Sequence, residues 1–177
     1  MRRPGQPGRP GAPVVSHIAL AIVGAASRGA AAGTRTVEVA VEQEVSWLLD
    51  RTRIIELTAR YNRCFDDGDV DGFVETFTED GVMEVTGSFS ATGREALGDM
   101  CRHTPWGTMH VTTGTTVEVN GDNAVQTVTL VVVSRPASKA DTPKLVGTGR
   151  YVDQLTRTAD GWRFRKRSAT LDGWNQK

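Results

Sequence analysis

Residues 50–87 read DRTRIIELTARYNRCFDDGDVDGFVETFTEDGVMEVTG, and the hydrophobic period changes within this stretch. Up to Phe65, apolar residues recur every three or four positions with charged residues between them. This spacing predicts an amphipathic helix that begins near Val45. The segment 66–68 (DDG) should end it, because glycine readily adopts the left-handed conformation of a helix C-cap.

The residues that follow predict a second helix and then a strand. Asp69 is typical of a helix N-cap, and the apolar residues up to Phe77 favour a short helix that ends near segment 79–81 (EDG). Over residues 82–86 (VMEVT) the helical spacing of apolar residues ends, which indicates a first strand.

The rest of the chain predicts one more helix and a run of long strands. The helix is expected over residues 94–102, and the strands over residues 108–119, 124–134, 146–157 and 162–171. Segments 120–122 (NGD) and 159–161 (ADG) are typical hairpin turns. Helices followed by antiparallel strands predict an α+β fold, with the helices packed on one face of a bent sheet.

The long strands carry apolar residues on both faces, since Val131, Val132 and Val133 are contiguous. One face must meet the helices, and the other is available to a second copy of the chain. We therefore expect a homo-oligomer, a dimer or a trimer.

The first 42 residues differ in composition from the rest. Residues 1–13 are rich in proline, glycine and arginine, which predicts a disordered extension, with one domain over residues 43–177. The apolar run 14–26 is too short to cross a bilayer. A secretory signal within residues 1–33 is the alternative interpretation; without one, the protein is expected in the cytoplasm.

Charge and cysteine content exclude several classes of function. The first 42 residues hold five of the 21 basic and two of the 21 acidic residues, so the remainder carries a net charge of −3. A mildly acidic domain is a poor candidate for nucleic-acid binding. Cys64 and Cys101 form no zinc-type spacing and are expected as buried thiols. No glycine-rich phosphate loop or metal-ligand cluster is present, so neither a metal nor another cofactor is predicted.

Several segments of the sequence, in the same order along the chain, resemble a known protein family. Residues 50–87 resemble the opening of SnoaL-like proteins of the nuclear transport factor 2-like superfamily, and segments 110–124, 147–169 and 170–174 (TLDGW) continue the likeness. The resemblance implies a cone-shaped, curved, mixed or antiparallel sheet whose N-terminal helices enclose a pocket for a small hydrophobic organic molecule. Such proteins include scytalone dehydratase, hexachlorocyclohexane dehydrochlorinase, ketosteroid isomerase, polyketide cyclases and the β subunits of aromatic-ring dioxygenases, so the fold does not settle the function.

The resemblance places Asp66 and His110 at the positions of a catalytic pair in the dehydratase and the dehydrochlorinase. There an aspartate at the end of the first helix orients a histidine on a strand, which leaves the second imidazole nitrogen free to accept a proton. The alternatives are structural: Asp66 as a helix-ending turn residue, and His110 as a hydrogen-bonded strand residue.

Further residues complete the expected site. The dehydrochlorinase resemblance puts Arg167 in the active site to stabilise an anion, although a solvated strand charge is the alternative. Tyr61 is expected either to donate a hydrogen bond to substrate or to pack in the core. The remaining expected wall or substrate-binding residues are Phe65, Met83, Phe89, Trp106 and Trp174. Asp153 is expected to pair with an arginine across strands.

Two hypotheses for the function follow. The first is a cofactor-independent lyase or isomerase that uses the pair of Asp66 and His110 for proton transfer. The scytalone dehydratase type of dehydration is disfavoured, because Phe65 occupies one of its tyrosine positions. The second hypothesis is a non-catalytic ligand-binding or assembly subunit that resembles a dioxygenase β subunit.

Overall fold

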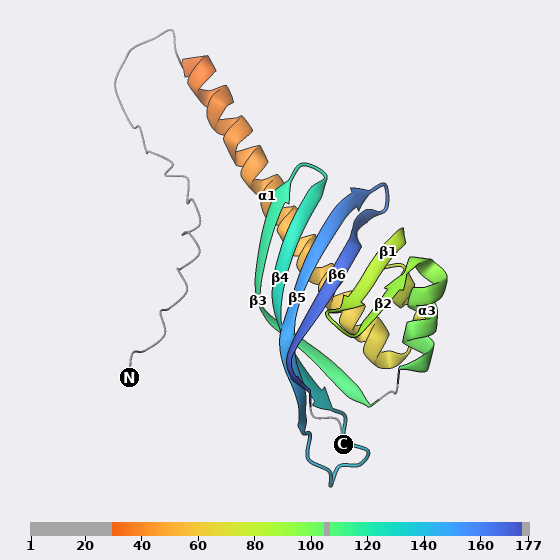
Figure 1. The fold of residues 1–177 in the computed structure, drawn as a ribbon. Helices are drawn as coiled ribbons and strands as arrows, with labels where there is room; N and C mark the ends of the chain where they lie inside the picture. Colours follow the sequence, from red (N-terminus) through yellow and green to blue (C-terminus); the bar gives the residue numbers. More distant parts are fainter. Residues whose placement is uncertain (1–29, 105–106, 175–177) are drawn as a thin grey trace, which may run out of the picture. The chain divides into compact units, whose positions relative to one another are not determined.

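The computed structural model describes residues 30–104 and 107–174, and it shows three helices and six strands in this part of the chain (Figure 1). In chain order they are α1 (Ala30–Asp67), α2 (Val70–Val74), β1 (Phe77–Val85), β2 (Phe89–Thr92), α3 (Gly93–His103), β3 (Thr108–Asn120), β4 (Asn123–Ser134), β5 (Leu145–Thr158) and β6 (Gly161–Trp174). The chain divides into two compact units, residues 1–39 and 40–177, and the sheet belongs to the second.

All six strands form one curved, unclosed sheet in the order β2-β1-β6-β5-β4-β3 (Figure 1). β1 and β6 run parallel, and every other neighbouring pair is antiparallel. Register shifts interrupt the ladders between β3 and β4, between β4 and β5, and between β5 and β6. Such bulges bend strands and increase their twist. The predicted α+β class with a curved mixed sheet is confirmed.

The predicted helix boundaries around residue 68 are also confirmed. α1 ends at Asp67, and Gly68 adopts a φ of 75°, as expected for a glycine that follows a helix. Oδ1 of Asp69 accepts a hydrogen bond of 2.9 Å from the backbone N–H of Gly72, so Asp69 caps α2.

α1 begins earlier than the apolar spacing predicts, at Ala30 rather than near Val45. Residues 37–49 are all exposed, so this part of the helix has no buried stripe for a sequence pattern to reveal. The extension predicted over residues 1–42 falls mostly outside the described residues, and its disorder stays a prediction.

The predicted end of the second helix is wrong, because α2 stops at Val74 and β1 has already begun at Phe77. Phe77 is 3% exposed and pairs with Phe164 of β6, so long-range pairing overrides the local helical spacing. Gly81 does not end a helix but lies at a register shift within β1. A Cβ at Gly81 would lie 2.7 Å from the Cβ of Phe77, so this tight bend requires glycine. The short edge strand β2 was not predicted.

Each of the four later strands lies within three residues of its predicted bounds, and both hairpin turns are confirmed. Gly121 and Gly161 take φ values of 58° and 103°, which favour glycine. Alternate residues of β4 and β5 are buried. They pack with side chains of α1 and α2 around an aromatic cluster: Tyr61, Phe73, Phe77, Tyr151 and Phe164.

Apolar side chains also lie on the opposite face of the sheet. Met109, Val111 and Leu145 are 38%, 48% and 56% exposed. Val133 lies between Met109 and Leu145 in the register of neighbouring strands, so these side chains form one patch. We call it the outer apolar patch.

Among the described residues, no helix is both long enough and apolar enough to span a membrane.

Candidate functional site

Asp66, in the last turn of α1, binds His110 of β3 through both of its carboxylate oxygens. Oδ1 lies 2.5 Å from the imidazole Nδ1, and Oδ2 accepts a hydrogen bond of 2.8 Å from the backbone N–H of His110. The side chains are 7% and 12% exposed, respectively. The first contact positions the imidazole ring, and the second positions the backbone of β3 at His110.

This geometry assigns the protons of the imidazole. An ionised carboxylate can only accept hydrogen bonds, so Nδ1 of His110 carries the hydrogen that points at Asp66. In the neutral ring, Nε2 is then the basic nitrogen. The Phe65 ring meets the imidazole edge-on, with centroids 5.4 Å apart, and restricts its rotation further. The arrangement is that of an oriented general base.

The helical repeat of α1 places three polar residues in a row toward the sheet: Thr58, Asn62 and Asp66. Residues four apart share one face of a helix. Nδ2 of Asn62 donates to Oγ1 of Thr112 at 3.1 Å, and Oγ1 of Thr58 accepts from Nε2 of Gln126 at 2.7 Å. Asn62 and Thr58 were not predicted as site residues, although the successive four-residue spacing of Thr58, Asn62 and Asp66 is a signal for them.

Arg167 lies inside the domain and forms an ion pair with Asp153 of the neighbouring strand. Both side chains are 0% exposed, and Nε and Nη2 of Arg167 donate to the two carboxylate oxygens at 2.8 and 2.7 Å. The predicted pairing of Asp153 with an arginine is thus confirmed. Burial disfavours the charged guanidinium, but the Asp153 carboxylate outweighs that effect and raises the pKa of Arg167 above its usual value.

Aromatic rings surround this guanidinium. The Cζ atom of Arg167 lies 4.2 Å from the ring centroids of Tyr61 and Tyr151 and 4.0 Å from that of Phe164. Within the described part of the chain, Arg167 donates hydrogen bonds to Asp153 and Thr58, not to the dyad of Asp66 and His110. Its Nη1 atom is buried without a hydrogen-bond partner.

Two of the other expected site residues, Phe65 and Tyr61, lie near Asp66 and His110: Phe65 contacts His110 directly, and Tyr61 packs behind Phe65 in the core. Phe65 contacts His110 and stacks on Tyr61, with centroids 6.2 Å apart. Tyr61 is 2% exposed and its hydroxyl points at the sulfur of Met83 at 3.6 Å, while burial raises its pKa to about 12. Tyr61 therefore packs in the core as a neutral phenol.

The structure separates the remaining expected residues from this group or leaves them undescribed. Phe89 is 43% exposed at the start of the edge strand β2. Trp106 and the side chain of Trp174 lie outside the described part of the chain. Among the residues that are described, no three His, Cys, Asp or Glu side chains form a group that could hold a metal ion.

Two grooves mark the surface of the second unit, with volumes of about 630 and about 370 Å³. Neither is lined by Asp66 or His110. A pocket around the dyad therefore stays a prediction.

Comparison with known proteins identifies the family. Residues 46–168 match the SnoaL-like domain. An NTF2-like protein with a cystatin-like fold from Novosphingobium aromaticivorans is 30% identical, with a TM-score of 0.68 over 75% of this chain and 89% of that one. A protein of unknown function from Mycobacterium tuberculosis is 33% identical, with a TM-score of 0.63 over 75% of each chain.

More distant solved structures share the fold. ActVI-ORFA from Streptomyces coelicolor is 22% identical, with a TM-score of 0.63 over 69% of this chain and 96% of that one. No curated protein matches the chain significantly. The match over residues 46–168 covers more than half of the chain and agrees with the α+β architecture. The chain therefore belongs to the SnoaL-like domain family.

Proposed function

We propose that this protein is a cofactor-independent lyase or isomerase that acts on a small organic molecule, with His110 as the general base. The observation that carries the proposal is the pair of hydrogen bonds from His110 to Asp66, at 2.5 and 2.8 Å. They direct Nδ1 toward the carboxylate and keep Nε2 as the proton acceptor. Family membership supports a small-molecule ligand.

The proposed step is removal of a proton from a carbon next to an electron-withdrawing group. Nε2 of His110 takes the proton, and Asp66 stabilises the resulting imidazolium. The electron pair of the C–H bond then forms a double bond as a leaving group departs, which is a lyase reaction. Alternatively, the pair enters the adjacent π system and the proton returns at another carbon, which is an isomerase reaction. Both routes balance without an external oxidant or reductant.

Arg167 and Asn62 complete the proposal as hydrogen-bonding groups for the ligand. Nη1 of Arg167 and Oδ1 of Asn62 are buried and have no partner among the described residues. Unsatisfied buried polar atoms cost free energy, so a ligand that bonds to them is favoured. A substrate with a carbonyl oxygen or an anionic oxygen that accepts from Arg167, and a hydroxyl that donates to Asn62, would satisfy both atoms.

The test is proton exchange in heavy water, followed by proton NMR on a panel of small ketones and β-hydroxy ketones. The wild type should exchange the proton next to the carbonyl, and His110→Gln should slow this exchange by roughly a hundredfold or more. Asp66→Asn should slow it as well, whereas Asp67→Asn changes an exposed carboxylate and serves as the matched control. Equal exchange rates in all four proteins would show that His110 is not the base.

The outer apolar patch favours a second candidate function, that of an assembly subunit. Met109, Val111 and Leu145 expose large apolar side chains on the sheet face opposite the core. Contiguous exposed apolar surface is typical of protein–protein contacts, and a homodimer is the simplest occupant. Sedimentation of wild type and Val111→Glu tests it, since a charge in the patch should shift a dimer toward monomer.

A further inference from the structure

A groove of about 630 Å³ lies between α1 and the turn that joins β5 to β6, and arginine dominates its charge. Arg53, Arg60 and Arg63 line it from α1, and Arg163 lines it from the start of β6. Two carboxylate residues, Glu56 and Asp160, also line it, so its side chains carry a net charge of +2. We call this the arginine groove.

Two of the four arginines that line the arginine groove form no ion pair with any described residue. Arg63 is exposed and makes no hydrogen bond or ion pair to any described residue. Nη1 of Arg163 donates only to the backbone carbonyls of Asp160 and Trp162, at 3.1 and 3.0 Å.

The other two arginines differ from each other. Arg60 is bound to Glu75 at 2.5 Å, outside the lining. Arg53 approaches Asp50 only to 3.9 Å, and that carboxylate is already held by Arg157. At least three guanidinium groups are therefore available to a ligand.

The spacing of the arginines indicates the shape of that ligand. Residues 53, 60 and 63 are separated by seven and three positions, so they share one face of α1. At 1.5 Å per residue they extend over about 15 Å. An extended peptide rises about 3.3 Å per residue, so four or five residues would span about the same length. A single small anion would contact the arginines at only one end of this row of about 15 Å.

The apolar residues that line the arginine groove indicate which class of anionic ligand fits it. Leu57 and Trp162 also line it, but they are only 7% and 3% exposed. The indole ring is therefore not open for base stacking, which single-stranded nucleic acids use on such surfaces. Carboxylates at regular spacing fit better, because the planar guanidinium pairs with carboxylate through two parallel hydrogen bonds.

We propose that the arginine groove binds an extended acidic peptide segment of a partner protein. This site is separate from the dyad of Asp66 and His110, so it adds to the proposed chemistry and does not depend on it. The segment presents about four carboxylate-bearing residues to Arg53, Arg63 and Arg163.

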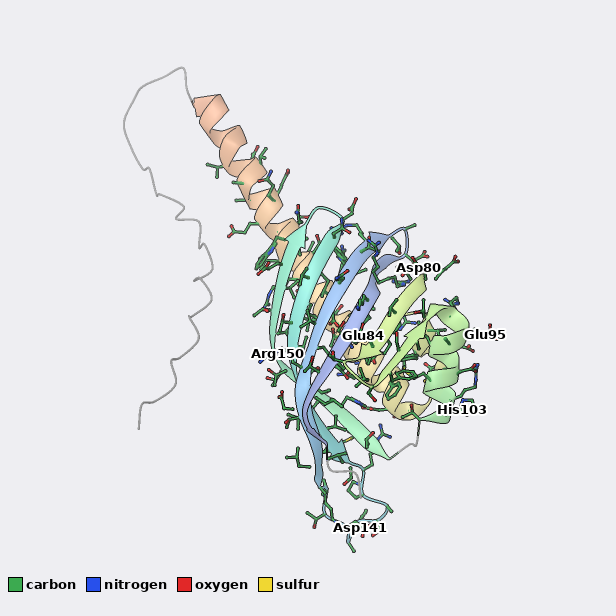
Figure 2. The ribbon with its side chains drawn as sticks, in the orientation of Figure 1. Asp80, Glu84, Glu95, His103, Asp141 and Arg150 are labelled. Atoms are coloured by element: carbon green, nitrogen blue, oxygen red, sulfur yellow. The ribbon has the colours of Figure 1, made fainter. Side chains whose placement is uncertain are left out.

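The test is binding of a fluorescein-labelled hexaglutamate peptide to the full chain, measured by fluorescence anisotropy at two salt concentrations. The wild type should bind it in a salt-dependent way. The double variant Arg53→Glu/Arg63→Glu should bind about tenfold or more weakly. The matched control is Arg94→Glu/Arg150→Glu, which makes the same change in net charge at exposed arginines outside the groove and should bind within about twofold of wild type. Arg150 lies on β5, on the exposed side of the strand (Figure 2).

Four results would overturn the proposal, and the first three concern direct binding. They are the absence of hexaglutamate binding by wild type, an equal loss of binding in both double variants, and tighter binding of labelled oligothymidylate than of hexaglutamate. Competition by inorganic phosphate at the concentration at which hexaglutamate competes would also contradict it, because a simple anion site would then explain the binding. Thermal unfolding of both double variants should match wild type, since all four substituted side chains are exposed.

Discussion

Asp66 holds His110 twice, by the imidazole Nδ1 and by the backbone N–H, across a sequence separation of 44 residues. The first contact selects the tautomer of the ring, and the second attaches β3 to the last turn of α1. A single carboxylate thus links the chemistry of the proposed base to the position of its strand.

The first prediction concerns the imidazole tautomer. In the wild type at neutral pH, heteronuclear NMR of the ring nitrogens should show Nδ1 protonated and Nε2 unprotonated in neutral His110. Asp66→Asn replaces an obligate acceptor with an amide that can also donate, so part or all of the population should move to the Nε2–H form. Asp67→Asn, next to the site but paired with Arg135 at the surface, should leave the spectrum unchanged. The same tautomer in all three proteins would contradict the assignment.

The second prediction concerns the buried pair of Arg167 and Asp153. Arg167→Met leaves a fully buried carboxylate without its cation and should lower the free energy of unfolding by about 3–5 kcal/mol. The double variant Arg167→Met/Asp153→Leu removes both charges and should recover part of that loss. Denaturant unfolding measures both, with Arg165→Met, an exposed position on the same strand, as the control. A double variant less stable than Arg167→Met would show that the pair does not act as a unit.

Arg167 also shows what the sequence could not predict. Arg163, Arg165 and Arg167 alternate along the chain and would share one face of a regular strand. Instead Arg165 is exposed and Arg167 is buried, because the register between β5 and β6 shifts at this point. Phe164 lies opposite Leu155 but Lys166 lies opposite Gln154, so Arg165 is the extra residue of a bulge. A bulge depends on the neighbouring strand, and the pattern of one strand does not reveal it.

Elements with a strong local signal were predictable. The spacing of apolar residues in α1, the glycines at 68, 121 and 161 and the alternation in β4 each follow from short-range stereochemistry. β1 was misplaced because its start depends on pairing with β6, far along the chain. The candidate residues Asp66 and His110 came from resemblance to a family, whereas the contact with the backbone N–H of His110 depends on how closely β3 approaches α1.

The third prediction concerns acid stability and Asp50. This carboxylate accepts hydrogen bonds of 2.7 and 2.6 Å from Arg157 and one of 3.1 Å from the indole of Trp162. The hydrogen bonds from Arg157 lower the pKa of Asp50 from its usual value, although burial opposes the shift. The folded state therefore binds this proton less readily than the unfolded chain. The resulting stabilisation is complete above the unfolded pKa and is lost as the pH falls through the folded pKa.

Asp50→Asn isolates this contribution. At neutral pH it should lower the free energy of unfolding by about 1–3 kcal/mol, since a charged hydrogen-bond partner is removed from a buried site. The difference from wild type should begin to shrink below about pH 4, where Asp50 of the unfolded chain takes up a proton, and should be lost as the pH falls through the lower pKa of Asp50 in the folded state. Urea unfolding over this range measures it, and Asp141→Asn in an exposed loop is the control. A difference that stays constant with pH would mean that the charge of Asp50 contributes nothing.

The fourth prediction contrasts two buried glycines. A Cβ at Gly149 would lie 2.3 Å from the backbone oxygen of Thr170, where β5 and β6 change register. Because a backbone atom cannot move aside without distorting the sheet, Gly149→Ala should destabilise the fold by about 1–3 kcal/mol.

A Cβ at Gly98 in α3 would meet its nearest neighbours, the guanidinium nitrogens of Arg102, at 3.4 Å, an ordinary contact with a flexible side chain. Gly98→Ala should therefore stabilise the protein by about 0.5–1 kcal/mol, through the higher helix propensity of alanine. Thermal unfolding of the two variants should shift the midpoint in opposite directions. A midpoint of Gly149→Ala at or above that of wild type would contradict the close approach at Gly149, and a lowered midpoint of Gly98→Ala would contradict the ordinary contact at Gly98.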